Sequence, residues 1–167
     1  MTKEFSLLGR NASNLIGALG EIIAWDTLKR MGILAYKIGS WNFFPEGYPH
    51  FRDKKLSFLT RKQAAFVEKK EENQIIEFDF VGVKCKDKFT VTLNKAEMEH
   101  VYSGIEGVYL IEVKAGRGAN IRHYVRNPMR AFSSENLERA KAIGFKVALV
   151  VVELFENWKY RISYREM

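Results

Sequence analysis

Cysteines, histidines and long apolar runs are all scarce in this chain of 167 residues. The single cysteine, Cys85, excludes an internal disulfide framework and any zinc or iron–sulfur site built from several cysteines. The three histidines are scattered without metal-ligand spacing, so we do not expect them to be catalytic. The longest apolar run, Val147 to Val152, is far too short to cross a bilayer. Residues 1–20 show no signal-peptide pattern, and we expect a cytoplasmic, intracellular protein without a membrane partner.

Acidic residues are outnumbered by basic ones. The chain has 27 Lys and Arg against 20 Asp and Glu, which gives a formal net charge of +7. Such an excess favours an anionic partner, which can be nucleic acid, a membrane surface or an acidic protein. A basic surface without a specific partner fits the charge equally well. The length predicts one domain over residues 1–167, and 47% apolar residues are enough to build a core.

Hydrophobic periodicity predicts an α/β domain with a central mixed β-sheet flanked by helices. Helices are expected at 14–31, 55–72 and 129–143, and loops at 40–55 and 115–127. Strands are expected at 33–38, 75–83, 88–93, 107–114, 146–153 and 158–164, with 88–93 as the hairpin partner of 75–83. The apolar segment 146–153 is typical of the centre of a sheet, and the alternating segment 158–164 of an edge.

Two carboxylates lie within apolar strand segments, where a charge needs a partner, a metal or a cleft. Asp79 lies in IIEFDFVGV, and Glu112 lies in VYLIEVK. Lys114 follows Glu112 by two residues and therefore projects from the same strand face, with Val113 turned to the other. Carboxylates suit Mg²⁺, which can polarise a phosphate and activate a water. The pattern predicts metal binding by Asp79, Glu112 and the carbonyl of Val113, with Lys114 beside the attacking water.

The aspartate followed by Glu112-Val113-Lys114 resembles the D…(D/E)XK signature of the PD-(D/E)XK nucleases, nearest in pattern to the archaeal Holliday-junction resolvases. Many members place a glutamate on the first helix, and here Glu21 stands in that context, between Gly17 and the later Leu28 and Gly32. Segment 136–152 followed by WKYR is similar to the helix and closing strands of those resolvases. The resemblance implies a restriction-endonuclease-like three-layer fold, DNA hydrolysis dependent on Mg²⁺ or Mn²⁺, and a homodimer.

Two features depart from the family pattern. Phe78 occupies the place of the proline before the aspartate, and the segment at about 40–73 reads as an insertion. Glu21 has no lysine or arginine three or four residues away, so it is either held near the metal as a further catalytic group or is an ordinary exposed helical glutamate. Glu77 shares a predicted strand face with Asp79, and we expect a surface role for it.

A basic segment follows the predicted catalytic strand. Residues 115–134 contain no acidic side chain, and their arginines are predicted to contact the phosphate backbone: Arg117, Arg122, Arg126 and Arg130. A basic loop without a specific role is the alternative. The aromatic segment 41–44 can stack on unpaired bases or pack within the protein.

Three functions remain open from the sequence. The first is the structure-selective nuclease that the resemblance implies. The second is a restriction-type or RecB-like nuclease that acts on DNA ends or single strands, without the iron–sulfur cluster that one cysteine excludes. The third is a non-catalytic nucleic-acid-binding module of the same fold, although binding alone gives no reason to hold two carboxylates beside a phosphate.

Overall fold

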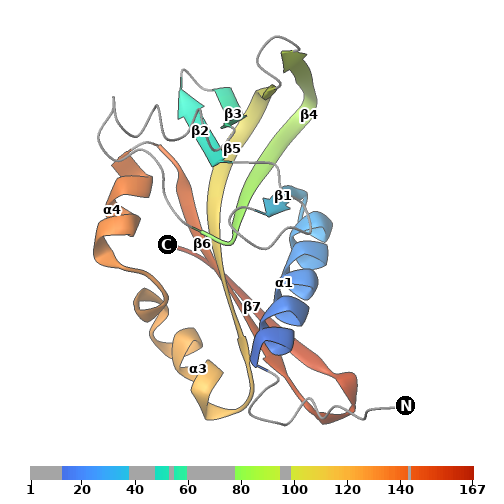
Figure 1. Ribbon diagram of the computed structural model, residues 1–167, viewed down its shortest axis with the longest axis vertical. Helices are drawn as coiled ribbons and strands as arrows, with labels where there is room; N and C mark the ends of the chain where they lie inside the picture. The colour runs from blue at the N-terminus through green and yellow to red at the C-terminus, as the bar shows by residue number, and fades with distance from the viewer. Residues whose placement is uncertain (1–12, 38–47, 53–54, 60–77, 95–98, 143) are drawn as a thin grey trace.

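The computed structural model describes residues 13–37, 48–52, 55–59, 78–94, 99–142 and 144–167. Its centre is a mixed sheet that crosses the molecule in the order β1-β4-β5-β6-β7 (Figure 1). These strands are β1 Ile33–Lys37, β4 Phe80–Asn94, β5 Glu99–Gly116, β6 Lys146–Leu154 and β7 Tyr160–Glu166. Strand β6 is parallel to β5, and the other neighbours are antiparallel. A hairpin of β2 (Tyr48–Arg52) and β3 (Lys55–Leu59) joins the first half of β5.

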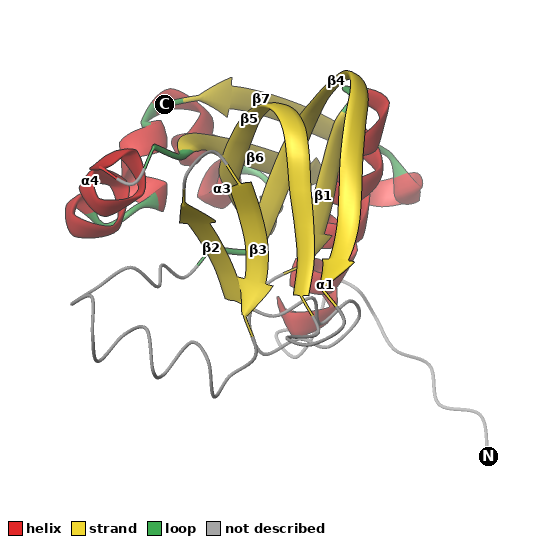
Figure 2. Ribbon diagram, turned by 90° about the horizontal axis from the view of Figure 1, so that it is seen from above, coloured by secondary structure: helices red, strands yellow, loops and turns green. Residues whose placement is uncertain are grey.

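Helices cover both faces of this sheet, so the molecule has three layers (Figure 2). Helix α1 (Ser13–Arg30) packs on one face. Helices α3 (Ala119–Arg126) and α4 (Ser134–Ala142) pack on the other face. The short 3-10 helix Pro128–Ala131 joins α3 to α4, and a second, Glu156–Trp158, lies in the β6–β7 turn. The expected α/β architecture around a mixed sheet is confirmed.

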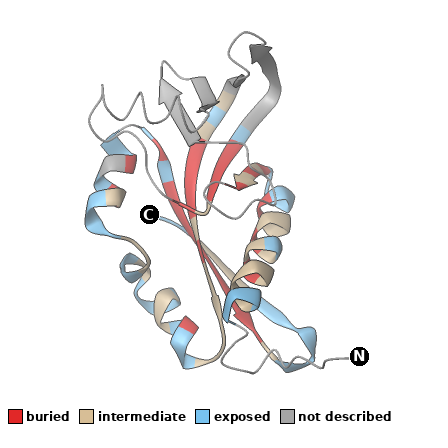
Figure 3. Ribbon diagram, in the orientation of Figure 1, coloured by how far each residue is buried: buried red, intermediate tan, exposed pale blue. Residues whose placement is uncertain are grey.

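Strand β5 supplies both halves of the core because its side chains alternate between the faces. Val108 and Leu110 pack with α4, whereas Tyr109, Ile111 and Val113 pack with α1. Strand β6 is buried from Val147 to Leu154 between β5 and β7, which confirms its expected central position (Figure 3). Strand β7 pairs with β6 alone among the described strands and forms the expected edge.

Helix α1 approaches the sheet closely through small residues. Gly20, Ala24 and Leu28 follow one another at helical spacing and are its buried residues. A Cβ atom on Gly20 would overlap the Cβ of Ala115 on β5. The side-chain hydrogen bond from Trp25 Nε1 to the carbonyl of Ala35, 2.9 Å long, ties the helix to β1. The helix and strand predicted at 14–31 and 33–38 are thus confirmed to within a residue of their described ends.

The predicted hairpin between 75–83 and 88–93 is wrong. Residues 80–94 form the single strand β4, with a register shift near Cys85, and its partner is β5. Predicted strand 107–114 is the second half of the longer β5. Local alternation could not separate these cases, because pairing between β4 and β5 is decided by the core that both strands share. Asp79 lies in a bend immediately before β4 instead of within the strand.

Most of the basic segment 115–127 is a helix rather than the expected loop. Residues 119–126 form α3, whose Ile121 is buried against Leu149 and Val151 of β6. Gly118 takes a positive φ of 58° at the helix start, a conformation that glycine adopts readily. A helix of eight residues is too short to be stable alone, so its packing on β6 stabilises it.

Three other expectations need correction. Segment 48–52 is a strand and not part of a loop, and 55–59 is a strand and not the start of a helix. The helix predicted at 129–143 is interrupted after Ala131, and α4 begins at Ser134. The rest of the presumed insertion at 40–73 lies outside the described residues, as do the aromatic segment 41–44 and Glu77.

The close approach of α1 to β5 predicts opposite effects of the same substitution at two glycines. Gly20→Ala should lower the free energy of unfolding by about 1–3 kcal/mol, because the added methyl group forces α1 away from Ala115. Gly17→Ala, which meets nothing within 4 Å, should raise it by up to about 1 kcal/mol through helix propensity. Urea denaturation of both variants tests this packing, and equal effects would contradict it.

Candidate active site

The candidate site lies where two neighbouring strands stop pairing. Strand β4 begins at Phe80, opposite Ile111, whereas β5 continues to Gly116 with β6 as its partner on the other side. The edge of β5 that faces β4 therefore has no strand partner after Ile111 among the described residues. The backbone N–H of Val113 on this edge donates a hydrogen bond of 2.7 Å to Oδ2 of Asp79. The carboxylate thus takes the place that a strand carbonyl would otherwise occupy.

Glu112 and Lys114 project from the same strand on the face covered by α3 and α4. Their side chains are partly buried, and Lys114 Nζ donates a hydrogen bond of 2.6 Å to Glu112 Oε1. Burial raises the pKa of Glu112, and the nearby charge of Asp79 raises it further, against the opposing effects of Lys114 and Lys37. A raised pKa means that the ionised carboxylate is held at a cost, which a cation placed between Asp79 and Glu112 would relieve.

Lys114 is held in its charged form. Burial acts to lower its pKa, but the hydrogen bond to Glu112 and the charges of Glu112 and Asp79 act in the opposite direction, and the pKa is raised overall. Lys114 is therefore an ammonium group at neutral pH. In this state it can donate hydrogen bonds to a water or a phosphate oxygen and can offset negative charge.

Lys37 is a further member of the site, and the sequence analysis did not identify it. Its ammonium group lies 2.9 Å from Glu21 Oε1 and 3.5 Å from Asp79 Oδ1, and only 7% of the side chain is exposed. The same group lies over the ring of Phe80, 5.2 Å from its centroid. Lys37 therefore links α1, β1 and the bend before β4.

A signal for Lys37 is present in the sequence. Ile33, Ala35 and Lys37 occupy alternate positions of one short strand, so the lysine continues a buried face. A buried ammonium needs a carboxylate partner. Glu21, sixteen positions earlier, is this partner. Pairs within one helix, three or four residues apart, do not include it.

The predicted site residues Glu21, Asp79, Glu112 and Lys114 are connected in this arrangement. Asp79 contacts Lys37 and the Val113 amide, Lys37 contacts Glu21, and Glu112 contacts Lys114 and feels the charge of Asp79. Three carboxylates and two lysines leave the cluster with one net negative charge. Glu21 is connected to the other carboxylates through its ion pair with Lys37. This ion pair distinguishes it from an ordinary exposed helical glutamate.

The donor set can be compared with the needs of a metal. No group of three or more His, Cys, Asp or Glu side chains suited to a metal occurs among the residues that the structure describes. Mg²⁺ usually binds through one or two carboxylates and retains several waters, so Asp79 and Glu112 are a sufficient side-chain set. The N–H and C=O of a strand residue face the same edge, and the carbonyl of Val113 therefore faces the Asp79 edge with its amide. These groups fit a hard divalent cation.

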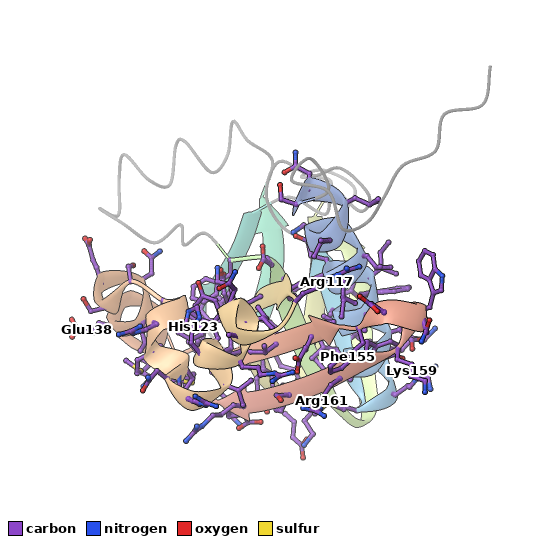
Figure 4. The ribbon with its side chains drawn as sticks, turned by 90° about the horizontal axis from the view of Figure 1, so that it is seen from below. Arg117, His123, Glu138, Phe155, Lys159 and Arg161 are labelled. Carbon is purple, nitrogen blue, oxygen red and sulfur yellow. The ribbon has the colours of Figure 1, made fainter. Side chains whose placement is uncertain are left out.

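The predicted phosphate-binding arginines are distributed around α3. Arg117 lies in the connection between β5 and α3 (Figure 4), and its Nε and Nη1 atoms are buried without a hydrogen-bond partner among the residues that the structure describes. Buried guanidinium donors of this kind need an acceptor. Arg122 and Arg126 lie one helical turn apart and line a pocket beside β6 and β7. Arg130 is exposed on the 3-10 helix and does not line this pocket.

Comparison with known proteins gives no match to a family model, a curated protein or a solved structure. Within the described part of the chain, no helix is both long enough and apolar enough to span a membrane. The geometry and charge of the site are therefore the basis on which its function is inferred.

Lys37 is predicted to stabilise the cluster by compensating its carboxylates. Lys37→Met should lower the free energy of unfolding by about 2–3 kcal/mol, because Glu21 and Asp79 would keep their charges in a half-buried environment without a cation. The double variant with Glu21→Gln should recover part of this loss. Arg30→Met, which removes an exposed ion pair with Asp26, is the control and should cost at most about 0.5 kcal/mol. Additive effects of the Lys37 and Glu21 substitutions in urea denaturation would contradict the coupling.

Proposed function

We propose that this protein is a metal-dependent nuclease that hydrolyses DNA phosphodiester bonds, with a restriction-endonuclease-like fold. The observation that carries the proposal is the convergence of Asp79, Glu112 and Lys114 at the edge where β5 extends past the start of β4. A mixed sheet with helices on both faces is compatible with that fold. The raised pKa of Glu112 supports a cation there, because burial and then the charge of Asp79 both disfavour the ionised carboxylate.

Asp79, Glu112 and the Val113 carbonyl would hold the metal, with Mg²⁺ or Mn²⁺ as the cofactor. When bound, such an ion polarises the phosphate and lowers the pKa of a coordinated water. The Val113 amide fixes the Asp79 carboxylate through one of its oxygens, Oδ2. The position of Asp79 is thus fixed by the sheet before a ligand binds.

The remaining residues have distinct roles in this proposal. Lys114 positions the attacking water and offsets the charge that develops on the phosphate oxygens as the water oxygen bonds to phosphorus and the leaving oxygen departs. Lys37 fixes Asp79 from the opposite face of the sheet, and Glu21 fixes Lys37. Glu21 is therefore a positioning residue that acts through Lys37.

DNA is the proposed partner because arginines follow the strand of Glu112 and Lys114 in the sequence. Arg117 follows the catalytic strand directly, its buried donors have no acceptor within the described part of the chain, and the chain carries a net charge of +7. Phosphate contacts of this type fix the position of the substrate without reading its sequence. A structure-selective, resolvase-like activity and a homodimer are the specific forms that the sequence resemblance adds to this proposal.

Metal binding is tested first without reference to activity. Millimolar Mg²⁺ or Mn²⁺ should raise the melting temperature of the wild-type protein, since a ligand at one hundred times its Kd adds about 2.7 kcal/mol of stability. Asp79→Asn and Glu112→Gln should abolish the shift. Without metal, the Glu112→Gln protein should be at least as stable as the wild type, because the substitution removes a charge that Asp79 repels. Glu106→Gln, which removes a half-exposed carboxylate of β5 that pairs with Lys84, is the control and should keep the shift.

Cleavage is tested on a labelled panel of four-way junction, flap, single strand and plain duplex. Each substrate is incubated with Mg²⁺, Mn²⁺ or EDTA. Metal-dependent cutting should fall at least ~100-fold in Asp79→Asn and Lys114→Ala, because each change removes a group that acts at the transition state. Lys84→Ala removes an exposed lysine of β4 and should leave the rate unchanged.

The outcomes distinguish the proposal from its alternatives. Preferential cutting of the junction supports the resolvase-like form, whereas cutting of ends or single strands supports the RecB-like form. Tight DNA binding without cutting would replace the nuclease by a binding module. A protein that neither binds nor cuts DNA overturns the proposal.

A further inference from the structure

A cationic site lies on the other side of α3 from the carboxylate cluster. It is a pocket of about 180 Å³ formed between α3, β6 and β7. Its polar lining consists of three arginines, one glutamate and one serine: Arg122, Arg126, Arg161, Glu153 and Ser163. Three guanidinium groups against one carboxylate leave the lining with two net positive charges. Ile121, Val125 and Val151 form the apolar wall.

The arginines of this pocket are held in place by a buried carboxylate. Only 6% of the Glu153 side chain is exposed, and its Oε1 accepts a hydrogen bond of 2.6 Å from Arg122 Nε. Its Oε2 lies 3.6 Å from Arg161 Nη1. Arg161 is also stacked against Phe155, with its Cζ 5.4 Å from the ring centroid (Figure 4). Although Arg161 is exposed, its guanidinium is therefore oriented from two sides.

This orientation leaves donors available for an oxyanion. A guanidinium has five N–H donors, and the bond to Glu153 uses only the Nε of Arg122. The terminal nitrogens suit the forked binding of a phosphate. The pocket is also smaller than the roughly 300–1,000 Å³ of sites for drug-sized ligands, so its size fits a phosphate group better than a whole nucleotide.

The sheet register relates this pocket to the candidate active site. Lys114 is aligned with Val151 on β6, and Val151 is aligned with Ser163 on β7. All three residues therefore lie on one sheet face, and Ser163 is two strand spacings, or about 10 Å, from Lys114. A nucleic-acid strand advances about 3.4 Å per nucleotide along its axis. A phosphate in the pocket would then be at least about three nucleotides from the scissile one, because α3 lies between the two sites.

We propose that the pocket of Arg122, Arg126 and Arg161, organised by Glu153, binds a backbone phosphate of the nucleic acid at a position away from the cut. The identity of the ligand as nucleic acid rests on the proposed function. The pocket itself is an oxyanion site with oriented guanidinium groups. Glu153 on β6 and Arg161 on β7 are distant in the sequence from the arginines of α3. The packing of α3 on β6 and the pairing of β6 with β7 bring these residues together.

The sharpest test keeps the charge and changes the geometry. Fluorescence anisotropy measures the affinity of labelled single-stranded and duplex DNA in EDTA, so that no cleavage is needed. Arg161→Lys should weaken binding roughly 5-fold, because lysine retains the charge but cannot form a fork or stack on Phe155 in the same way. Arg165→Lys, on the same strand and outside the pocket, is the control and should leave the affinity unchanged. Equal affinities for the two variants overturn the proposal.

A second variant separates an oriented site from a diffuse basic surface. Glu153→Gln makes the protein more positive by one charge, so simple electrostatic attraction predicts tighter DNA binding. The oriented pocket predicts weaker binding, because Arg122 and Arg161 lose the carboxylate that fixes them. Circular dichroism establishes that the variant is folded, and the exposed Arg161→Lys variant decides the question if it is not.

Inorganic phosphate distinguishes the source of the bound group. It should compete with DNA in the wild type and less in Arg161→Gln, whose salt dependence of DNA binding should also fall by about one counterion. Phosphate binding through Arg161 with DNA affinity unaffected by the substitution would overturn the nucleic-acid assignment. Cleavage is scored separately: loss of DNA affinity in Arg161→Lys without any cutting by the wild type would reject the nuclease and retain the pocket.

Discussion

The hydrogen bond between the Val113 amide and the Asp79 carboxylate joins the fold to its candidate chemistry. Strand β4 starts opposite Ile111, and β5 continues beyond that point with an edge that pairs with no other described strand. An unpaired strand edge needs acceptors for its amides. The bend before β4 places Asp79 where it meets this need, and the two carboxylates are brought close as a consequence. The site is therefore a product of unequal strand lengths in a sheet whose core requires β4 and β5 to pair.

The charges of the cluster come from both faces of the sheet. Glu112 and Lys114 lie on the face of α3, whereas Glu21 and Lys37 belong to the side of α1. Asp79 lies between the two groups and interacts with both, through its contact with Lys37 and through its charge on Glu112. Movement of α1 would therefore change the position of Asp79 through Lys37. Gly20 packs closely against Ala115, the residue after Lys114, and this contact limits such movement.

Strong periodic segments allowed much of the fold to be predicted. Strand β1 and the buried β6 were correct because each has a pattern that local burial explains. Helix α1 was also correct, although its buried face is formed by Gly20, Ala24 and Leu28 while Leu15 and Ile22 are exposed. The pairing of β4 with β5 and the short helix α3 were not predicted, since long-range packing determines both. The presence of Asp79, Glu112 and Lys114 at one site could be predicted from carboxylates in apolar strands. Lys37 could not be assigned in that way, because its partners are distant in the sequence.

The sheet also explains why a short chain can hold a cationic pocket near a negatively charged cluster. Helix α3 covers the end of β5 and part of β6, so the carboxylates lie on one side of it and the pocket of Arg161 on the other. Glu153 offsets much of the repulsion among the pocket arginines, just as Lys37 and Lys114 offset that among the carboxylates. Each region retains a small net charge of the sign opposite to its proposed ligand. That residual charge favours binding, whereas complete internal neutralisation would leave a stable protein with little attraction for metal or phosphate.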